Sequence, residues 1–422
     1  MRSRNFRITL FTQIVGLLCS GILNFAMALH ILDMTGSAAI FSTIISISFI
    51  PTIVFGPIGG ILADRLPKKR LLMIADTVKA LLVTALAIEL FRGTASIFFI
   101  GFVLTLMITL TTVYFPIIAA IVPTIVDKED IVKANGLAQG VKSLSRFAAP
   151  ALGGLMFGTI GIYYLVIGVA GLYIISAITN IFLSLPETET GFKGGVVKAI
   201  ASDLRAGFVY ITKTDPRVFD LALTVGIIAM AFFSLLTVAL PFVGRVVLGV
   251  SEAQFGIAQA LVALSALFGA VFSNHAKVKT YLKPKYLIHW TFVSAILSLP
   301  IGIAVLPHFD MSPAGRFFVF TMGLFLVMAV FTVFNIIKMA AIQENAPRDM
   351  VGKATALTMA ITILPIPIMQ RLLGSWLDRV VEGRLELSTI FFALTLFVFL
   401  VGIVKSVAKN PFKYTKSKMR SE

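Results

Sequence analysis

The chain has 422 residues, of which 58% are hydrophobic and only 13% are charged. Soluble proteins carry about 25% charged residues, so this composition excludes an ordinary soluble domain and indicates an integral membrane protein. The net charge of +16 does not indicate nucleic-acid binding, because the basic residues gather in alternate loops between apolar stretches. The single cysteine, Cys19, lies within an apolar stretch, which excludes a disulfide framework.

Twelve apolar stretches of roughly the 20 residues that a membrane helix needs predict an all-α membrane protein. The stretches are continuous and not alternating, which favours helices over a β-barrel. We expect twelve transmembrane helices in two bundles of six. The predicted spans are 8–32, 39–63, 71–91, 96–122, 137–158, 163–185, 217–242, 253–273, 286–306, 315–342, 355–378 and 388–408.

The distribution of basic residues predicts the orientation of these spans. One side of the membrane receives nearly all of the Lys and Arg residues. The loops of the other side hold only Arg92, Arg245, Arg316, Arg379 and Arg384. By the positive-inside rule the first side is cytoplasmic. We therefore expect a multi-pass protein of the cell membrane of a bacterium, with both termini in the cytoplasm.

The longest connection, residues 186–216, divides the chain into two halves. Apolar residues recur at helical spacing over 196–213, which predicts an amphipathic helix on the cytoplasmic surface. Similar short sequences, Lys133–Leu137 and Lys353–Leu357, lead into the fifth and eleventh spans. Repeated bundles of this kind enclose a central cavity and give alternating access. The predicted parts are an N-terminal bundle (1–185), a linker (186–216), a C-terminal bundle (217–408) and a basic cytoplasmic tail (409–422).

Residues 60–70, Gly-Ile-Leu-Ala-Asp-Arg-Leu-Pro-Lys-Lys-Arg, form a dense charged loop between the second and third spans. Its candidate gating residues are Gly60, Asp64, Arg65, Lys68, Lys69 and Arg70. Membrane topology alone accounts for the last three cations, but it does not account for Asp64. An unpaired ion at a helix end is costly, so we expect Asp64 and Arg65 to contact another helix end as a latch. Gly60 would allow a close approach.

This loop resembles motif A of the major facilitator superfamily, and four further segments narrow the resemblance to its macrolide-efflux and siderophore-exporter branch. These segments are Asp33–Ala38, Ala134–Gly136, Ala149–Gly154 and Asp203–Gly207. The resemblance implies a two-bundle fold in which the first, fourth, seventh and tenth helices line the cavity. It also implies a helix-packing motif in the fifth span, formed by Ala149, Pro150, Gly153 and Gly154.

The chain departs from the pattern of drug antiporters at two places. Ala149 stands before Pro150 where those proteins usually have Gly, although Ala is also small enough for close helix packing. The fourth predicted span, 96–122, contains no Arg, whereas many drug–proton antiporters carry one there that is implicated in proton coupling. Coupling through such an Arg is therefore not expected in this chain.

Polar residues within the spans predict the substrate path. The candidates are Asn24, Thr105, Thr109, Thr112, Arg146, Ser234, Thr237, Asn335, Lys338, Gln370 and Arg371. The three Thr residues form a stripe on the fourth span, but each can also bond its own backbone. Amides prefer polar surroundings, which favours the two Asn residues as cavity-lining groups.

Basic residues inside spans are costly and usually face a cavity or a partner. Lys79 lies one helical turn after Asp76, so a local ion pair is expected. Lys338 either snorkels to the cytoplasmic surface or faces a pocket. Arg146 either lines the path or pairs with an acid of another helix, and Arg371 is within reach of the outer surface.

Candidates for a coupling proton are scarce. Asp33 and Asp220 lie near span ends, where burial would let protonation alternate with access; the alternative is that they are ordinary helix-end charges. The sequence contains no nucleotide-binding loop. Its four histidines are scattered and show no metal-ligand spacing. We therefore expect no metal, no cofactor and no enzymatic activity.

These observations predict a secondary transporter that exports a bulky amphiphile, such as a drug, macrolide or siderophore-like compound. The expected partners are this small molecule, protons exchanged in antiport and the lipid bilayer, and the expected state is a monomer. The basic residues within spans leave open an organic-anion carrier or symporter. A non-transporting membrane scaffold or sensor is the alternative of another class, although the chain has almost no extramembrane domain to relay a signal.

Overall fold

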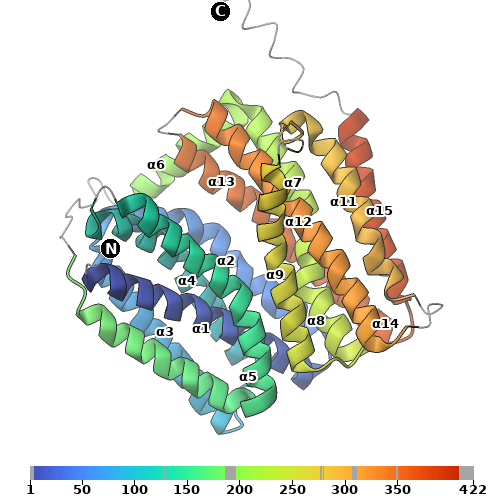
Figure 1. The fold of residues 1–422 in the computed structure, drawn as a ribbon, viewed down its shortest axis with the longest axis horizontal. Coiled ribbons are helices and arrows are strands. Elements are labelled where there is room, and N and C mark those ends of the chain that lie inside the picture. Colours follow the sequence, from blue (N-terminus) through green and yellow to red (C-terminus); the bar gives the residue numbers. More distant parts are fainter. Residues whose placement is uncertain are drawn as a thin grey trace, which may run out of the picture. The chain divides into compact units, whose positions relative to one another are not determined.

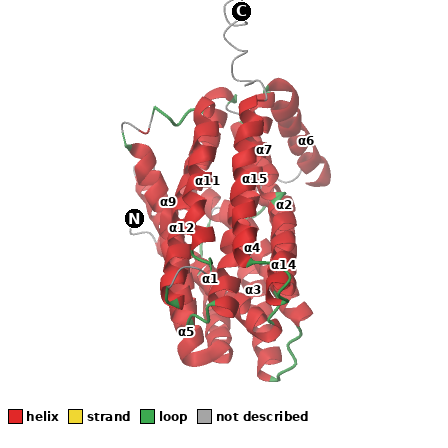
Figure 2. Cartoon of the chain, turned by 90° about the vertical axis from the view of Figure 1, so that its right-hand side faces the viewer, coloured by secondary structure: helices red, strands yellow, loops and turns green. Residues whose placement is uncertain are grey.

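The computed structural model describes residues 4–127, 130–185, 196–275, 278, 280–306, 311–347 and 350–407. Throughout these residues the chain forms helices joined by short loops, and no strand occurs among them (Figures 1 and 2). The predicted all-α fold is confirmed. Continuous helices are expected in lipid, because every backbone polar group must then be satisfied within its own segment.

Five long helices follow the apolar stretches of the first half. They are α1 (Arg4–Thr35), α2 (Ala38–Arg65), α3 (Lys68–Phe91), α4 (Ile97–Ile125) and α5 (Ile131–Ile181). Ser96 caps α4 by accepting a hydrogen bond from the backbone N–H of Phe99. The helix α5 covers the fifth and sixth predicted spans, and Gly161 interrupts its helical geometry with a φ of 75°, which a residue without Cβ adopts at little cost.

The second half contains α6 (Val196–Val209), α7 (Pro216–Ser234), the short α8 (Leu240–Phe242), α9 (Glu252–Asn274), α11 (Leu287–Ile303), α12 (Pro313–Asn345), α13 (Val351–Ile363), α14 (Ile366–Val381) and α15 (Leu387–Val407). Wider π-helical turns occur at 210–214, 235–239 and 243–247. The single eleventh span that we expected is divided at Pro365 into α13 and α14, because proline cannot donate the helical hydrogen bond.

Within the described residues, ten helical stretches are long and apolar enough to cross a membrane. The twelve predicted spans also include α2, whose apolar part, Ala38–Ile53, is shorter. The prediction also places two spans in the stretch Ala148–Ile181, which is counted here as one and in which Gly161 breaks the helix. A multi-pass membrane protein is therefore confirmed, while the number twelve stays a prediction.

The chain forms two compact units. Unit 1 comprises Met1–Gly36, Ile47–Ser202 and Ser251–Ala260, and unit 2 comprises Ser37–Ser46, Asp203–Val250 and Leu261–Glu422. In unit 1, α5 packs against α1 and α3; in unit 2, α11 packs against α12 and α15 (Figure 1). The helix α2 begins in unit 2 and continues in unit 1, and α9 does the reverse. The division proposed from the sequence did not include these exchanged segments.

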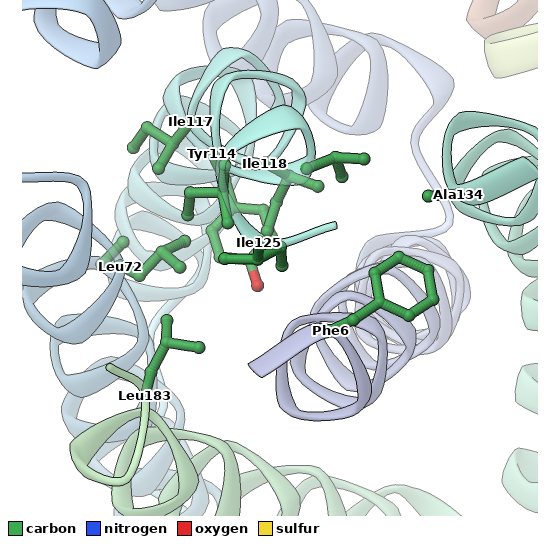
Figure 3. Packing of buried hydrophobic residues seen from close by; sticks show 11 residues of the cluster. Phe6, Leu72, Tyr114, Ile117, Ile118, Ile125, Ala134 and Leu183 are labelled. Atoms are coloured by element: carbon green, nitrogen blue, oxygen red, sulfur yellow. The ribbon is translucent and has the colours of Figure 1, made fainter. Parts of the chain in front are cut away.

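Apolar side chains from four helices meet in unit 1. Phe6 of α1, Leu72 of α3, Ile117 of α4 and Ala134 of α5 belong to one buried cluster, which Leu183 joins from beyond α5 (Figure 3). In lipid such clusters are stabilised by close packing, since acyl chains are as apolar as these side chains. Tyr114 also lies in this cluster, and its ring leads to the polar site described next.

Candidate functional site

Four charged side chains are buried among the described residues: Asp76, Lys79, Asp215 and Lys338. Asp215 accepts a hydrogen bond from its neighbour Arg217 at 2.7 Å, at the start of α7. Asp76 and Lys79 lie on α3 in unit 1, and neither has any exposed surface. Their three-residue spacing places them one above the other on one side of the helix. Burying an ion in a membrane helix costs several kcal/mol (about 2.5–3.5 on insertion scales), so these two side chains require an explanation.

Two donors from α5 hold the Asp76 carboxylate. The Oγ of Ser176 donates to Asp76 Oδ2 at 2.8 Å, and the Nδ2 of Asn180 donates to the same oxygen at 2.7 Å. Ser176 and Asn180 are four residues apart, so they lie on one face of α5. The other carboxylate oxygen, Oδ1, is buried without a hydrogen-bond partner in the described structure. The two hydrogen bonds from α5 therefore meet at one oxygen of the carboxyl group, Oδ2.

The Lys79 ammonium is held by aromatic rings. Its Nζ lies 4.4 Å from the ring centroid of Tyr114 of α4 and 5.8 Å from that of Tyr173 of α5. Both distances fall within the range of cation–π attraction. Nζ makes no hydrogen bond in the described structure. No hydrogen bond joins Lys79 to Asp76 in the described structure, but the two charges interact electrostatically. The local pair that the sequence predicted is therefore an electrostatic one, while the two heads are directed to groups on other helices.

A chain of hydroxyl groups starts beside this pair. The hydroxyl of Tyr173 lies 2.8 Å from Ser20 Oγ, and Ser20 Oγ lies 3.1 Å from Thr111 Oγ1. Tyr173 is wholly buried, whereas Thr111 is only half-buried. The hydroxyls thus connect α5, α1 and α4 in unit 1, from the interior to a more accessible position.

The predicted threonine stripe lies in unit 1 and mainly satisfies its own helix. Thr105, Thr109 and Thr112 each donate to the carbonyl oxygen four residues earlier, at 2.7–2.8 Å. Two of them also reach α2, since Ser48 Oγ lies 3.1 Å from Thr105 Oγ1 and Thr52 Oγ1 lies 3.4 Å from Thr112 Oγ1. The stripe therefore faces α2.

Most of the other candidate cavity residues with described side chains bond within their own helix, and one pair joins two helical segments. Asn24, Ser234 and Asn335 each donate to a carbonyl four residues earlier in their own helix. In unit 2 the Nε2 of Gln370 donates to Thr237 Oγ1 at 2.9 Å, which joins α14 to the π-helical turn after α7.

Two basic candidates of unit 2 differ sharply. Lys338 is only 5% exposed, and its Nζ donates to Thr362 Oγ1 of α13 at 3.0 Å. It does not snorkel to the surface, because its ammonium is held inside the unit. Arg371 is exposed, and its expected reach toward the outer surface of the membrane stays a prediction.

The two acids that the sequence favoured for coupling are placed differently from Asp76. Asp33 is exposed, and Asp220 forms an ion pair with Lys405 of α15. Sequence reasoning treated Asp76 only as a neighbour of Lys79. Its position inside the predicted span 71–91, one helical turn before another ionisable residue, was the signal that could have identified it.

Of the charged residues of motif A, the structure describes the side chains of Lys68, Lys69 and Arg70. Lys69 Nζ donates to the carbonyl of Ile181 at 2.9 Å, which ties the start of α3 to the end of α5. Lys68 is half-buried and Arg70 is exposed. The side chains of Gly60, Asp64 and Arg65, and that of Arg146, lie outside the described part of the structure.

The residues of the fifth-span motif lie where helices approach closely in unit 1. Ala149 is buried against Gly21 of α1. A Cβ at Gly153 would lie 3.0 Å from the Phe25 ring, and a Cβ at Gly154 would lie 3.1 Å from the Cα of Gly256 in α9. Small residues allow such contacts. The carbonyl oxygen of Pro150 would lie 2.8 Å from a Cβ at Gly256, so it borders the same contact.

A multi-pass helical protein with ionisable groups buried inside its bundles has the features of a membrane transport protein. The profile of the Major Facilitator Superfamily matches residues 9–366. The chain belongs to this superfamily, and it is therefore a transport protein.

Named relatives are similar over nearly the whole chain. Macrolide efflux protein A of Streptococcus pyogenes is 24% identical over 389 residues, which cover 89% of this chain and 91% of that protein. The enterobactin exporter EntS of Escherichia coli O1:K1 / APEC is 23% identical over 386 residues, covering 87% and 84%.

Solved structures support the fold. A nucleoside transporter, NupG, superimposes with a TM-score of 0.72 at 13% identity, over 94% of this chain and 98% of that one. A D-xylose–proton symporter gives a TM-score of 0.64 at 15% identity, over 94% and 96%.

Proposed function

We propose that this protein is a secondary active exporter of bulky amphiphilic small molecules, of the drug, macrolide or siderophore type, that works by alternating access and proton antiport. The observation that carries this proposal is the similarity, over more than four fifths of the chain, to two proteins that are both named as exporters. They are named for macrolides and for enterobactin, which are large molecules with mixed polar and apolar surfaces.

Some side chains of unit 2 are of the kinds that such a substrate would contact. Gln370 and Thr237 form one polar contact there, at 2.9 Å. Aromatic rings are close by, since Phe233 and Phe331 pack edge to face at 5.3 Å. A site with mainly apolar lining and a few directional polar groups binds amphiphiles and tolerates variation among them.

Export can be tested in bacterial cells that lack their own broad-specificity pumps. The probes are erythromycin, a catecholate siderophore and the cationic dye ethidium. We expect expression of the protein to lower the steady-state accumulation of at least one probe, and a protonophore to abolish the difference. Equal accumulation of every probe in expressing and empty-vector cells would contradict the proposal.

An organic-anion carrier is the second candidate, because Lys338 is buried with a hydroxyl and not an acid as its hydrogen-bond partner. In that case Lys338→Met would reduce the flux of an anionic probe at least about tenfold and leave a cationic probe unchanged. For an exporter of neutral or cationic amphiphiles, the substitution would affect both classes of probe alike.

Motif A is proposed to control access on the cytoplasmic side. If Asp64 stabilises one access state through another helix end, Asp64→Asn should reduce the transport rate while the protein still reaches the membrane. The measurement is the initial rate of probe efflux, normalised to the amount of protein in isolated membranes. An unchanged rate would remove Asp64 from the gating mechanism.

A further inference from the structure

We propose that Asp76 and Lys79 form the site at which the coupling proton is bound and released. This inference rests on the proposed proton antiport and assigns a location to it, inside unit 1 and away from the acids at the span ends. Four observations carry it: the carboxyl geometry, the setting of the ammonium, the adjacent hydroxyls and the placement of the other acids.

The carboxyl group of Asp76 can gain a proton without losing a hydrogen bond. Ser176 and Asn180 both donate to Oδ2, and this oxygen can still accept both hydrogen bonds, more weakly, as the carbonyl oxygen of a carboxylic acid. Oδ1 is the atom without a partner, so it is the atom on which the proton would reside. With Asp76 ionised, Oδ1 is a buried acceptor without a partner in the described structure, which costs about 1–3 kcal/mol.

The net charge of the site then changes by one with each proton. With Asp76 ionised, carboxylate and ammonium balance and the buried site is neutral; with a proton on Oδ1, the site carries the +1 charge of Lys79. The titratable groups that face the pair from the neighbouring helices are Cys19 of α1, Tyr114 of α4 and Tyr173 of α5. All three are uncharged in their protonated forms.

An uncompensated positive charge inside the membrane is costly. The ring faces of Tyr114 and Tyr173 offset part of this cost in the state with a proton on Asp76. Because the two protonation states differ in electrostatic free energy, any rearrangement of unit 1 that changes the surroundings of Lys79 also changes the affinity for the proton. This linkage is what an antiporter needs.

A chain of hydroxyl groups lies next to the pair. Tyr173, Ser20 and Thr111 are linked by contacts of 2.8 and 3.1 Å in which either oxygen can donate, and the Tyr173 hydroxyl also donates to the carbonyl of Gly16 at 3.3 Å. The ring of Tyr173 faces Lys79, and Thr111 is half-buried on α4. In the described structure no hydrogen bond joins these hydroxyls to Asp76, so a proton would reach them from Oδ1 only after a local rearrangement of unit 1.

Other described acids of the spans are placed less well for this role. Asp220 is paired with Lys405, and Asp33 is exposed. Glu89 lies at the end of α3 and accepts a hydrogen bond from Thr94 Oγ1 at 2.7 Å. Glu89 is on the same helix as Asp76 but outside the buried cluster, and it therefore provides a matched control.

The first test follows the proton itself and needs no substrate. Purified protein in lipid is titrated from about pH 9 to about pH 5 while infrared difference spectra record protonated carboxyl groups. We expect the wild type and Glu89→Gln to share a carboxyl band that Asp76→Asn lacks. Removal of the ammonium in Lys79→Gln favours the neutral carboxyl group, so the midpoint of the band should move to higher pH by about one unit or more. A spectrum that is the same in the wild type and Asp76→Asn would overturn the proposal.

The second test measures coupling in proteoliposomes, with erythromycin, a catecholate siderophore and ethidium as the probes. We expect Asp76→Asn to lose pH-driven accumulation about tenfold or more and to retain probe-for-probe exchange within about twofold. Glu89→Gln should retain both activities. If Asp76→Asn accumulates probe as well as the wild type under a pH gradient, the inference is overturned. It is also overturned if the variant loses both probe-for-probe exchange and pH-driven accumulation, because that result would indicate a structural role for Asp76. If the wild type moves none of the probes, the proposed export fails, and the infrared titration still decides the role of Asp76.

Discussion

Lys338 and Lys79 are both lysines buried in membrane-spanning helices, but they are stabilised by different means. Lys338 donates a hydrogen bond to Thr362 at 3.0 Å, whereas Lys79 rests on the rings of Tyr114 and Tyr173. A hydrogen bond to a charged group contributes about 1.5–3 kcal/mol, and a desolvated cation–π contact about 2 kcal/mol. Each lysine therefore depends on a few named neighbours, and those neighbours can be tested one at a time.

Thr362→Val should destabilise the protein by about 1–3 kcal/mol, because it leaves the buried Lys338 ammonium without its hydroxyl acceptor. The measurement is the thermal unfolding temperature of purified protein in detergent. Thr332→Val is the matched control, since Thr332 donates only to Met328 of its own helix and should change the temperature little. If adding Lys338→Met to Thr362→Val does not restore stability, the coupling between the two residues is refuted.

At the scale of helices, the start of α2 is capped by a carboxylate from α14. Asp378 Oδ1 accepts from the backbone N–H of Ala38 at 2.6 Å, and Oδ2 accepts from the Ser37 hydroxyl at 2.7 Å and from the N–H of Ala39 at 3.1 Å. These residues all belong to unit 2. A negative charge at a helix N-terminus satisfies free N–H groups and interacts favourably with the helix dipole. A Cβ at Gly374, one turn before Asp378, would lie 2.6 Å from the carbonyl oxygen of Ala38, so a residue without Cβ is required for this approach.

Asp378→Ala should lower stability by about 0.5–2 kcal/mol, because three donors at the start of α2 lose their acceptor. Gly374→Val should cost more, since its side chain would overlap the backbone of α2. Both effects are measured as changes in unfolding temperature in detergent. Glu386→Ala, an exposed acid in the following loop, serves as the control. Equal unfolding temperatures for Asp378→Ala and Glu386→Ala would show that the cap contributes nothing.

At the scale of the whole molecule, α2 and α9 each contribute to both units. The first turn of each helix is held by a contact within its own unit. These contacts are the Asp378 cap of α2 in unit 2 and the contact of Gly256 in α9 with Gly154 in unit 1.

The orientation in the membrane is also a property of the whole chain. Because basic residues gather in the loops of one side, we expect both termini in the cytoplasm. Green fluorescent protein fused after residue 422 should fluoresce, and alkaline phosphatase inserted at Gly93, between α3 and α4, should be active. Active phosphatase at the C-terminus would reverse the predicted topology.

The sequence by itself determined the class of protein and most of its helices. The ends of α3 and α12 lie within a few residues of the predicted spans, because the length of an apolar run and the need to satisfy its backbone in lipid are local properties. The break at Pro365 could have been predicted from the residue type. The sequence also identified Lys79 and Lys338 as basic residues at unusual depth.

The tertiary structure alone decided what these ions contact. Asp76 and Lys79 are three residues apart, and a local argument pairs them. Their actual neighbours, Ser176 and Tyr114, come from helices tens of residues away along the chain. The contacts of a side chain depend on how helices pack, and packing is set by the fit of whole helix surfaces and not by spacing along one helix. For that reason the sequence indicated that a charge is buried, and only the fold showed which groups of other helices hold the Asp76 carboxyl group and the Lys79 ammonium.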